Sequence, residues 1–158
     1  MQDFVHLHVH TQYSLLDGQA SVARLVDKAM KNGMKGIAVT DHGNMFGIKE
    51  FTNYVNKKNS GPKGEVKDLK KRIAGIEAGT IECEDKEAEI AACKAKIVEA
   101  ENKLFKPIIG CEMYVARRTM DLKEGKPDQS GYHLIVLAKN ETGYHHHIKL
   151  VSHAWTRG

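Results

Sequence analysis

Residues 36–47 have the sequence GIAVTDHGNMFG, and this stretch decides the expected fold. The apolar run at residues 36–40 predicts a short buried strand, and Asp41 and His42 follow it directly. A helical pattern then continues through Val55. In parallel α/β folds the chemistry gathers at the carboxyl ends of the strands, so Asp41 and His42 are expected at a functional edge.

Further elements are expected on both sides of this stretch. A strand is predicted at residues 4–10, a helix from Ser21 as N-cap to Gly33, strands at residues 107–116 and 132–138, and a helix from Asn140 onward. The order strand, helix, strand, helix at the start favours a parallel sheet.

The segment of residues 61–104 differs from the rest, because it is rich in Lys, Glu and Ala. Apolar residues recur there at alternating spacings of three and four, which is typical of a heptad seam. Gly, Thr and Asp at residues 79–85 interrupt the pattern. We expect an antiparallel helical hairpin, a solvated insertion without chemistry of its own.

The composition is that of one soluble globular domain of 158 residues, 41% apolar and 28% charged. It contains neither an apolar run long enough to span a membrane nor a secretory leader, so a cytoplasmic protein without a membrane partner is expected. The three cysteines form no disulfide framework or zinc motif. A net charge of +4 tolerates nucleic acid nearby without requiring it.

His8 and His10 are two residues apart in the first predicted strand. Side chains alternate across a strand, so both imidazoles are expected on one face, where they could hold a metal. Such a pair by itself fits surface histidines on an edge strand equally well.

Other metal donors accompany the remaining strands. Asp17 follows the first strand, Asp41 and His42 follow the second, Glu112 lies in the third and His133 opens the fourth. Each has an ordinary explanation when taken alone: a turn residue, a helix cap, a surface charge or a loop histidine. Together they supply the nitrogen and oxygen donors that zinc, manganese or iron prefer, and we expect a metal site.

Four blocks of the sequence resemble, in order, the motifs of PHP domains at the start of bacterial C-family replicative DNA polymerases. They are HVHTQYSLLDG (residues 8–18), TDHGNMFG (40–47), PIIGCEMYV (107–115) and HLIVLAKN (133–140). The resemblance covers nearly the whole chain except the hairpin.

The resemblance implies part of a seven-fold β/α barrel, with about four βα units present in residues 1–158 and residues 61–104 inserted as the hairpin. It implies up to three divalent metal ions, and a ligand set of His8, His10, Asp17, His42, Glu112 and His133. Asp41 is expected behind the ligands, orienting a ligand imidazole. No side chain is expected to be the nucleophile, since such sites activate water. Family ligands from later strands have no counterpart, so a fragment is expected.

The same resemblance implies a DNA-directed DNA polymerase for the complete protein and at most a metal-dependent phosphoesterase for this stretch. The implied partners are DNA and other replisome subunits, with a proofreading exonuclease among the candidates. Two alternatives stay open. The chain is an inactive structural or interaction module of the polymerase, or it is a free-standing PHP phosphatase.

Two further features near the end of the chain have competing interpretations. His145, His146 and His147 point in different directions on a helix, so a surface run is favoured over a metal site. Trp155 and Tyr144 fit core packing better than stacking on a nucleotide base.

Overall fold

The computed structural model describes residues 4–157, and these form two compact units. The first consists of the described residues of Met1–Tyr54 and Lys106–Gly158, and the second is Val55–Phe105. The six predicted metal ligands all belong to the first unit.

A three-stranded sheet with the order β1-β2-β3 forms the centre of the first unit. Strand β1 (Gly36–Val39) runs parallel to β2 (Lys106–Val115), whereas β3 (Tyr132–Leu137) runs antiparallel to β2. All three strands were predicted, but the expectation of a parallel sheet is wrong for β3. A parallel return needs a long crossover, usually a helix, and the segment between β2 and β3 contains only the short 3-10 turn η1 (Lys126–Asp128).

The strand predicted at residues 4–10 does not form. This segment is extended beside β1, and the carbonyl oxygens of His6 and Val9 accept bonds from the amides of Ala38 and Thr40, each at 2.9 Å. The amide of Val9, however, donates to the side-chain oxygen of Thr40 at 2.9 Å. This side-chain bond interrupts the regular ladder, so the described chain has three strands where four were expected.

The predicted helix boundaries agree with the structure where caps specify them. Helix α1 (Val22–Lys31) begins after Ser21, whose hydroxyl accepts the amide of Arg24 at 3.4 Å, and the chain leaves it through Gly33 at φ 76°. Helix α5 (Glu141–Arg157) begins after Asn140, whose side chain accepts the amide of Gly143 at 2.9 Å.

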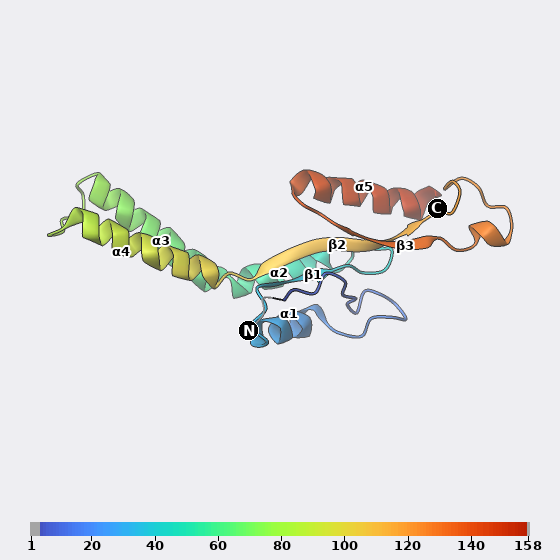
Figure 1. Cartoon of the computed structure of the whole chain (residues 1–158), viewed down its shortest axis with the longest axis horizontal. Coiled ribbons are helices and arrows are strands. Elements are labelled where there is room, and N and C mark those ends of the chain that lie inside the picture. Colours follow the sequence, from blue (N-terminus) through green and yellow to red (C-terminus); the bar gives the residue numbers. More distant parts are fainter. Residues whose placement is uncertain (1–3, 158) are drawn as a thin grey trace. The chain divides into compact units, whose positions relative to one another are not determined.

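Helices lie on both sides of this sheet (Figure 1). Helix α1 packs on β1, and α5 packs on β2 from the opposite side. Apolar side chains from α1, β1, the helix α2 (Ile48–Lys58) and β2 form the core of this unit. They are Val22, Val26, Ala29, Ile37, Ala38, Val39, Ile48, Phe51 and Cys111.

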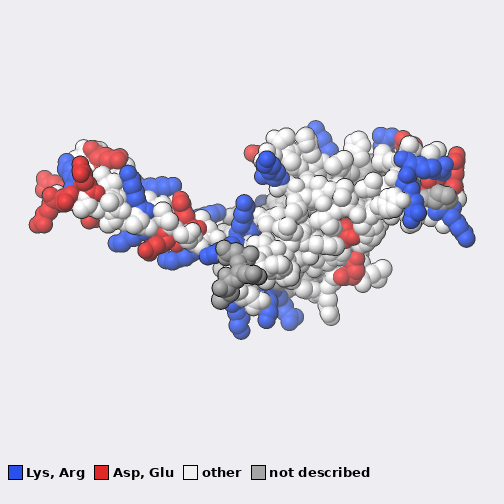
Figure 2. All heavy atoms as spheres, viewed as in Figure 1, with Lys and Arg blue, Asp and Glu red and all other residues white. Residues whose placement is uncertain are grey.

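The second unit is a pair of helices, α3 (Ser60–Glu77) and α4 (Lys86–Asn102), packed against each other. Asp85 caps α4 by accepting the amide of Ala88 at 3.0 Å. Ile76, Cys93 and Ala100 are buried in this unit. Positive and negative side chains are intermixed along the visible surface of both helices (Figure 2), as expected for solvated faces. No helix in residues 4–157 is long and apolar enough to cross a membrane.

Candidate metal centre

The backbone brings His42 beside Glu112 by continuing the β1–β2 pairing past the end of β1. His42 and Glu112 form an isolated parallel bridge. The Gly43 amide donates to the Glu112 carbonyl oxygen at 2.9 Å, and the Glu112 amide donates to the Asp41 carbonyl oxygen at 3.2 Å. The carboxyl end of β1 therefore meets the middle of β2, as the sequence predicted for this edge.

Glu112 is the centre of the cluster, and its side chain is only 7% exposed. One carboxylate oxygen, Oε2, lies 3.1 Å from Nε2 of His8 and 2.6 Å from Nε2 of His10. The other, Oε1, lies 2.7 Å from Nδ1 of His133. A single buried carboxylate thus contacts three imidazoles.

Asp17 connects the remaining ligand candidates. Its Oδ1 lies 3.2 Å from Nδ1 of His10, and its Oδ2 lies 2.7 Å from Nδ1 of His42. All six predicted ligands consequently fall into three overlapping groups whose donor atoms lie within 4.8 Å of one another. The groups are His8, His10 and Glu112; His10, Asp17 and His42; and His42, Glu112 and His133.

His133 reaches the cluster because β3 is antiparallel. It lies near the start of β3 and pairs with Tyr114 in β2, two residues from Glu112. Residues two apart share a face, so His133 and Glu112 are diagonal neighbours on one side of the sheet. The expectation that ligands gather at carboxyl strand ends therefore does not apply to His133.

Asp41 lies behind the cluster, where its carboxylate organises the loop between His10 and Asp17. It is 1% exposed and accepts the amide of Thr11 at 2.6 Å, the hydroxyl of Thr11 at 2.9 Å and the hydroxyl of Ser14 at 2.9 Å. Ser14 in turn accepts the amide of His42 at 2.9 Å. The side-chain contacts of Asp41 thus go to Thr11 and Ser14, and Ser14 links Asp41 to the backbone of His42. That Asp41 orients a ligand imidazole stays a prediction. The HVHTQYS motif contains both Thr11 and Ser14. Their role as hydrogen-bond partners of Asp41, however, depends on the burial of that carboxylate in the fold.

The loop that carries Asp17 closes tightly on itself. The amide of Gly18 donates to the Ser14 carbonyl oxygen at 2.8 Å, and a Cβ on Gly18 would lie 1.9 Å from the Thr11 carbonyl oxygen. Only glycine fits at this position. The Asp-Gly pair that signalled a turn in the sequence is therefore required for this close approach.

The donor set fits a divalent cation. Four imidazoles and two carboxylates supply nitrogen and oxygen ligands, the combination suited to zinc, manganese and iron. Nε2 of His42 is buried and has no hydrogen-bond partner among the described residues. An unpaired buried imidazole nitrogen is costly, and a cation would satisfy it.

The chain matches a known protein family. Residues 6–104 and 87–158 both match the PHP domain family, and together they cover nearly the whole chain. The chain belongs to the PHP domain family.

Relatives of this PHP chain include three proteins named DNA polymerase III subunit alpha. Those of Treponema pallidum (strain Nichols) and Borreliella burgdorferi are 38% and 39% identical over 156 and 158 residues, and each match covers 98% of the chain. That of Aquifex aeolicus is 31% identical over 163 residues, covering 99% of the chain. In each case the match covers 10% of the relative, so the PHP chain spans about a tenth of the length of these proteins.

Hydrogen bonds from imidazoles control the ionisation of the two carboxylates in the PHP site. Contacts with His42 and then His10 lower the pKa of Asp17. Burial acts to raise the pKa of Glu112, but contacts with His8, His133 and His10 hold it below its ordinary value. Both groups are thus kept in the anionic form that binds a cation.

An aromatic side chain that sequence reasoning missed lies against two of the ligand candidates. The Tyr114 ring is 4.8 Å from the His42 ring at 31° and 4.9 Å from the His133 ring at 85°. The alternation of β2 could have placed Tyr114 on the same face as Glu112. The two imidazoles that it contacts, however, belong to His42, which follows β1, and to His133 in β3. Only the tertiary fold brings these two residues next to Tyr114.

The histidine run of α5 does not join the centre, but it is not wholly on the surface. His147 is buried, with Nδ1 2.8 Å from the Gly143 carbonyl oxygen and Nε2 3.0 Å from the Val136 carbonyl oxygen. The prediction of a surface run is therefore wrong for His147, because α5 turns this position toward β3. The prediction of core packing is also wrong for Trp155, which is 67% exposed.

Proposed function

We propose that this PHP chain binds divalent cations through His8, His10, Asp17, His42, Glu112 and His133 and hydrolyses phosphoesters. The observation that carries the proposal is the buried, unpaired Nε2 of His42 inside a cluster of converging carboxylates and imidazoles. Such a nitrogen costs free energy unless a ligand outside the protein pairs with it.

The overlap of the three donor groups supports a centre of up to three cations. His10, His42 and Glu112 each belong to two of the groups. Shared ligands of this kind hold neighbouring cations close together, as in sites that act on phosphate esters. The mixed nitrogen and oxygen donors favour zinc, manganese or iron.

The chemistry divides between the cations and the protein. Bound divalent cations supply Lewis acidity toward phosphoryl oxygens. Glu112 and Asp17 supply the negative charge that holds cations, and their lowered pKa values keep that charge in place. His8 and His133 are half-exposed, so they border the side from which a phosphoester can approach.

For the whole protein we propose a DNA-directed DNA polymerase, because the relatives described above bear that name. In this proposal DNA, other replisome subunits and a proofreading exonuclease are partners in the cytoplasm, and the three-stranded sheet is part of a PHP-type barrel. The hairpin at residues 61–104 is an insertion in that barrel. A free-standing phosphatase is less favoured, since the relatives are polymerase subunits.

The first test is the metal content of the purified chain, measured by elemental mass spectrometry. We expect bound manganese, zinc or iron in the parent, loss of metal in His8→Ala and His42→Ala, and retention in His146→Ala, an exposed histidine on α5. Hydrolysis of bis(p-nitrophenyl) phosphate should follow the metal content. A parent that binds no metal would contradict the proposal.

A structural role for the metal is the second candidate, and the distribution of the ligands favours it. The ligand candidates come from residues 8–10, the loop at Asp17, the residue that follows the end of β1 by three positions, β2 and β3. A bound cation would therefore cross-link stretches that are far apart in sequence. Metal retained without hydrolysis of either a phosphodiester or a monoester, together with a large loss of stability on chelation, would select this role. Cleavage of monoesters alone would select the phosphatase.

A further inference from the structure

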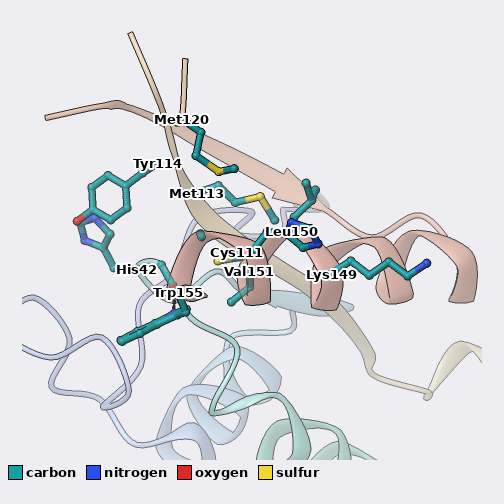
Figure 3. A pocket seen from close by; sticks show the side chains of 12 residues that line it. His42, Cys111, Met113, Tyr114, Met120, Lys149, Leu150, Val151 and Trp155 are labelled. Atoms are coloured by element: carbon teal, nitrogen blue, oxygen red, sulfur yellow. Dashed lines mark hydrogen bonds between the residues drawn. The ribbon is translucent and has the colours of Figure 1, made fainter. Parts of the chain in front are cut away.

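A cavity of about 760 Å³ borders the metal centre along His42 and Tyr114. Its other walls come from β2, from the segment after β2 and from the last turns of α5 (Figure 3). This volume lies in the range of small-molecule sites, which is about 300–1,000 Å³. None of the proposed metal ligands other than His42 lines it.

Two exposed aromatic rings are the distinctive feature of this cavity. Trp155 is 67% exposed and Tyr114 is 58% exposed. The indole of Trp155 is nevertheless held in place, because its Nε1 donates to the carbonyl oxygen of Gly43 at 2.9 Å, next to the ligand candidate His42. A large ring that is fixed in position yet exposed leaves a binding surface open to a ligand.

The remaining wall suits a flat, polarisable group. Met113 and Met120 line the cavity close to Tyr114 in Figure 3, and thioether sulfurs make favourable contacts with aromatic rings. Among the described residues that line the cavity none is acidic, whereas Lys149 and His153 are present. The cavity therefore does not repel an anionic ligand.

We propose that this cavity binds a planar aromatic ring carried by a phosphate ester whose phosphate lies at the metal centre. The inference rests on the proposed function, because the metal centre holds the phosphate and the cavity selects what is attached to it. Trp155 and Tyr114 are then the residues that determine specificity. A nucleotide and a simpler aryl phosphate both carry this chemistry, and the experiment separates them.

Trp155 is the only tryptophan of the chain, so its fluorescence reports directly on the cavity. Manganese-loaded and EDTA-treated protein are titrated with phenyl phosphate, thymidine 5′-monophosphate, glycerol phosphate and inorganic phosphate. We expect the two aromatic esters to quench the fluorescence saturably and to bind roughly tenfold more tightly than glycerol phosphate, as stacking on aromatic side chains provides. Tighter binding of the nucleotide than of phenyl phosphate identifies nucleotides as the preferred source, and equal binding identifies any aryl ester.

Variants then locate the preference, with calorimetry replacing fluorescence where the tryptophan is removed. Trp155→Leu should abolish the tenfold difference between phenyl and glycerol phosphate. Tyr132→Leu should leave it unchanged, since Tyr132 is similarly exposed at 59% on the neighbouring strand but does not line the cavity. A parent that binds phenyl phosphate no more tightly than glycerol phosphate, with and without manganese, would overturn the inference. Failure of the proposed function would give a different result: the protein would bind neither manganese nor inorganic phosphate.

Discussion

At the scale of single residues, the candidate site depends on buried side chains that lie behind the six ligand candidates. Asp41 is buried and uses both carboxylate oxygens to hold Thr11 and Ser14. The hydroxyl oxygen of Ser14 also accepts the amide of His42, so the same network holds the backbone of His42. The position of one ligand candidate is thus determined by a hydrogen-bond network around a buried charge.

Thr11→Val tests this network with almost no change of shape. The substitution removes the hydroxyl that donates to Asp41 at 2.9 Å and leaves a buried carboxylate with one partner fewer. We expect a loss of about 1–3 kcal/mol in the free energy of unfolding, measured by urea denaturation. Thr156→Val, at an exposed position of α5, is the matched control and should change stability little. Equal stability of the two variants would contradict this account.

Burial of Cys111 predicts a pH dependence. Burial raises the pKa of this thiol from 9.0 to about 11. Between these values the unfolded chain releases the proton while the folded chain retains it, so the unfolded state binds fewer protons and stability falls as pH rises. This loss of folding free energy begins near pH 9 and reaches about 2–3 kcal/mol near pH 11.

Denaturation of the parent and of Cys111→Ala from pH 8 to pH 11 measures this difference. The parent should lose more stability across the window than the variant, whereas Cys83→Ala should behave as the parent does. In the native protein at pH 8, Cys83 should react with a thiol reagent first, because Cys111 is buried. Rapid labelling of Cys111 in the folded protein would refute the prediction.

At the scale of elements, one polar side chain closes the base of the helical pair. Asn59 precedes α3 and is 5% exposed. Its amide nitrogen donates to the Phe105 carbonyl oxygen at 2.8 Å, and its oxygen accepts the Phe105 amide at 2.9 Å. These two bonds join the chain before α3 to the chain after α4.

Asn59→Ala should therefore destabilise the second unit. It leaves a buried amide and a buried carbonyl of Phe105 without their partners, which costs about 1–3 kcal/mol for each group. Amide hydrogen exchange measured by mass spectrometry should show faster exchange in α3 and α4. Asn56→Ala removes an exposed asparagine of α2 and serves as the control, and similar exchange in both variants would rule out a role for Asn59.

At the scale of the whole molecule, the six ligand candidates come from separate stretches of the first unit, and residues 4–10 form no regular ladder with β1. Cations bound by these residues would therefore act as cross-links in the folded state alone. Anything that binds only the folded state stabilises it in proportion to the logarithm of its concentration.

Added manganese should accordingly raise the thermal unfolding temperature of the parent. At a metal concentration one hundred times the dissociation constant, the expected gain is about 2.7 kcal/mol. His42→Ala should lose most of this gain, and acid should abolish it because imidazoles must be unprotonated to bind a metal. Differential scanning fluorimetry measures the shift, and the same rise in His42→Ala as in the parent would show that manganese binds elsewhere.

The local parts of the structure could be predicted from the sequence. Ser21 and Asn140 cap the helices that their positions predicted, and the apolar run before Asp41 forms β1. Caps, turns and periodicity depend on residues that are close in the chain, so the sequence contains all the information needed to predict them. The family motifs extended this to a list of six ligand candidates, which the fold brings together.

The tertiary structure alone decided the features that depend on distant partners. The direction of β3, the irregular pairing of residues 4–10 and the burial of His147 all follow from which strand or helix lies opposite. The same is true of Trp155, which is exposed yet anchored on Gly43. A sequence pattern predicts which face of a helix or strand a side chain occupies. The pairing of segments far apart in the chain determines which residues that side chain contacts.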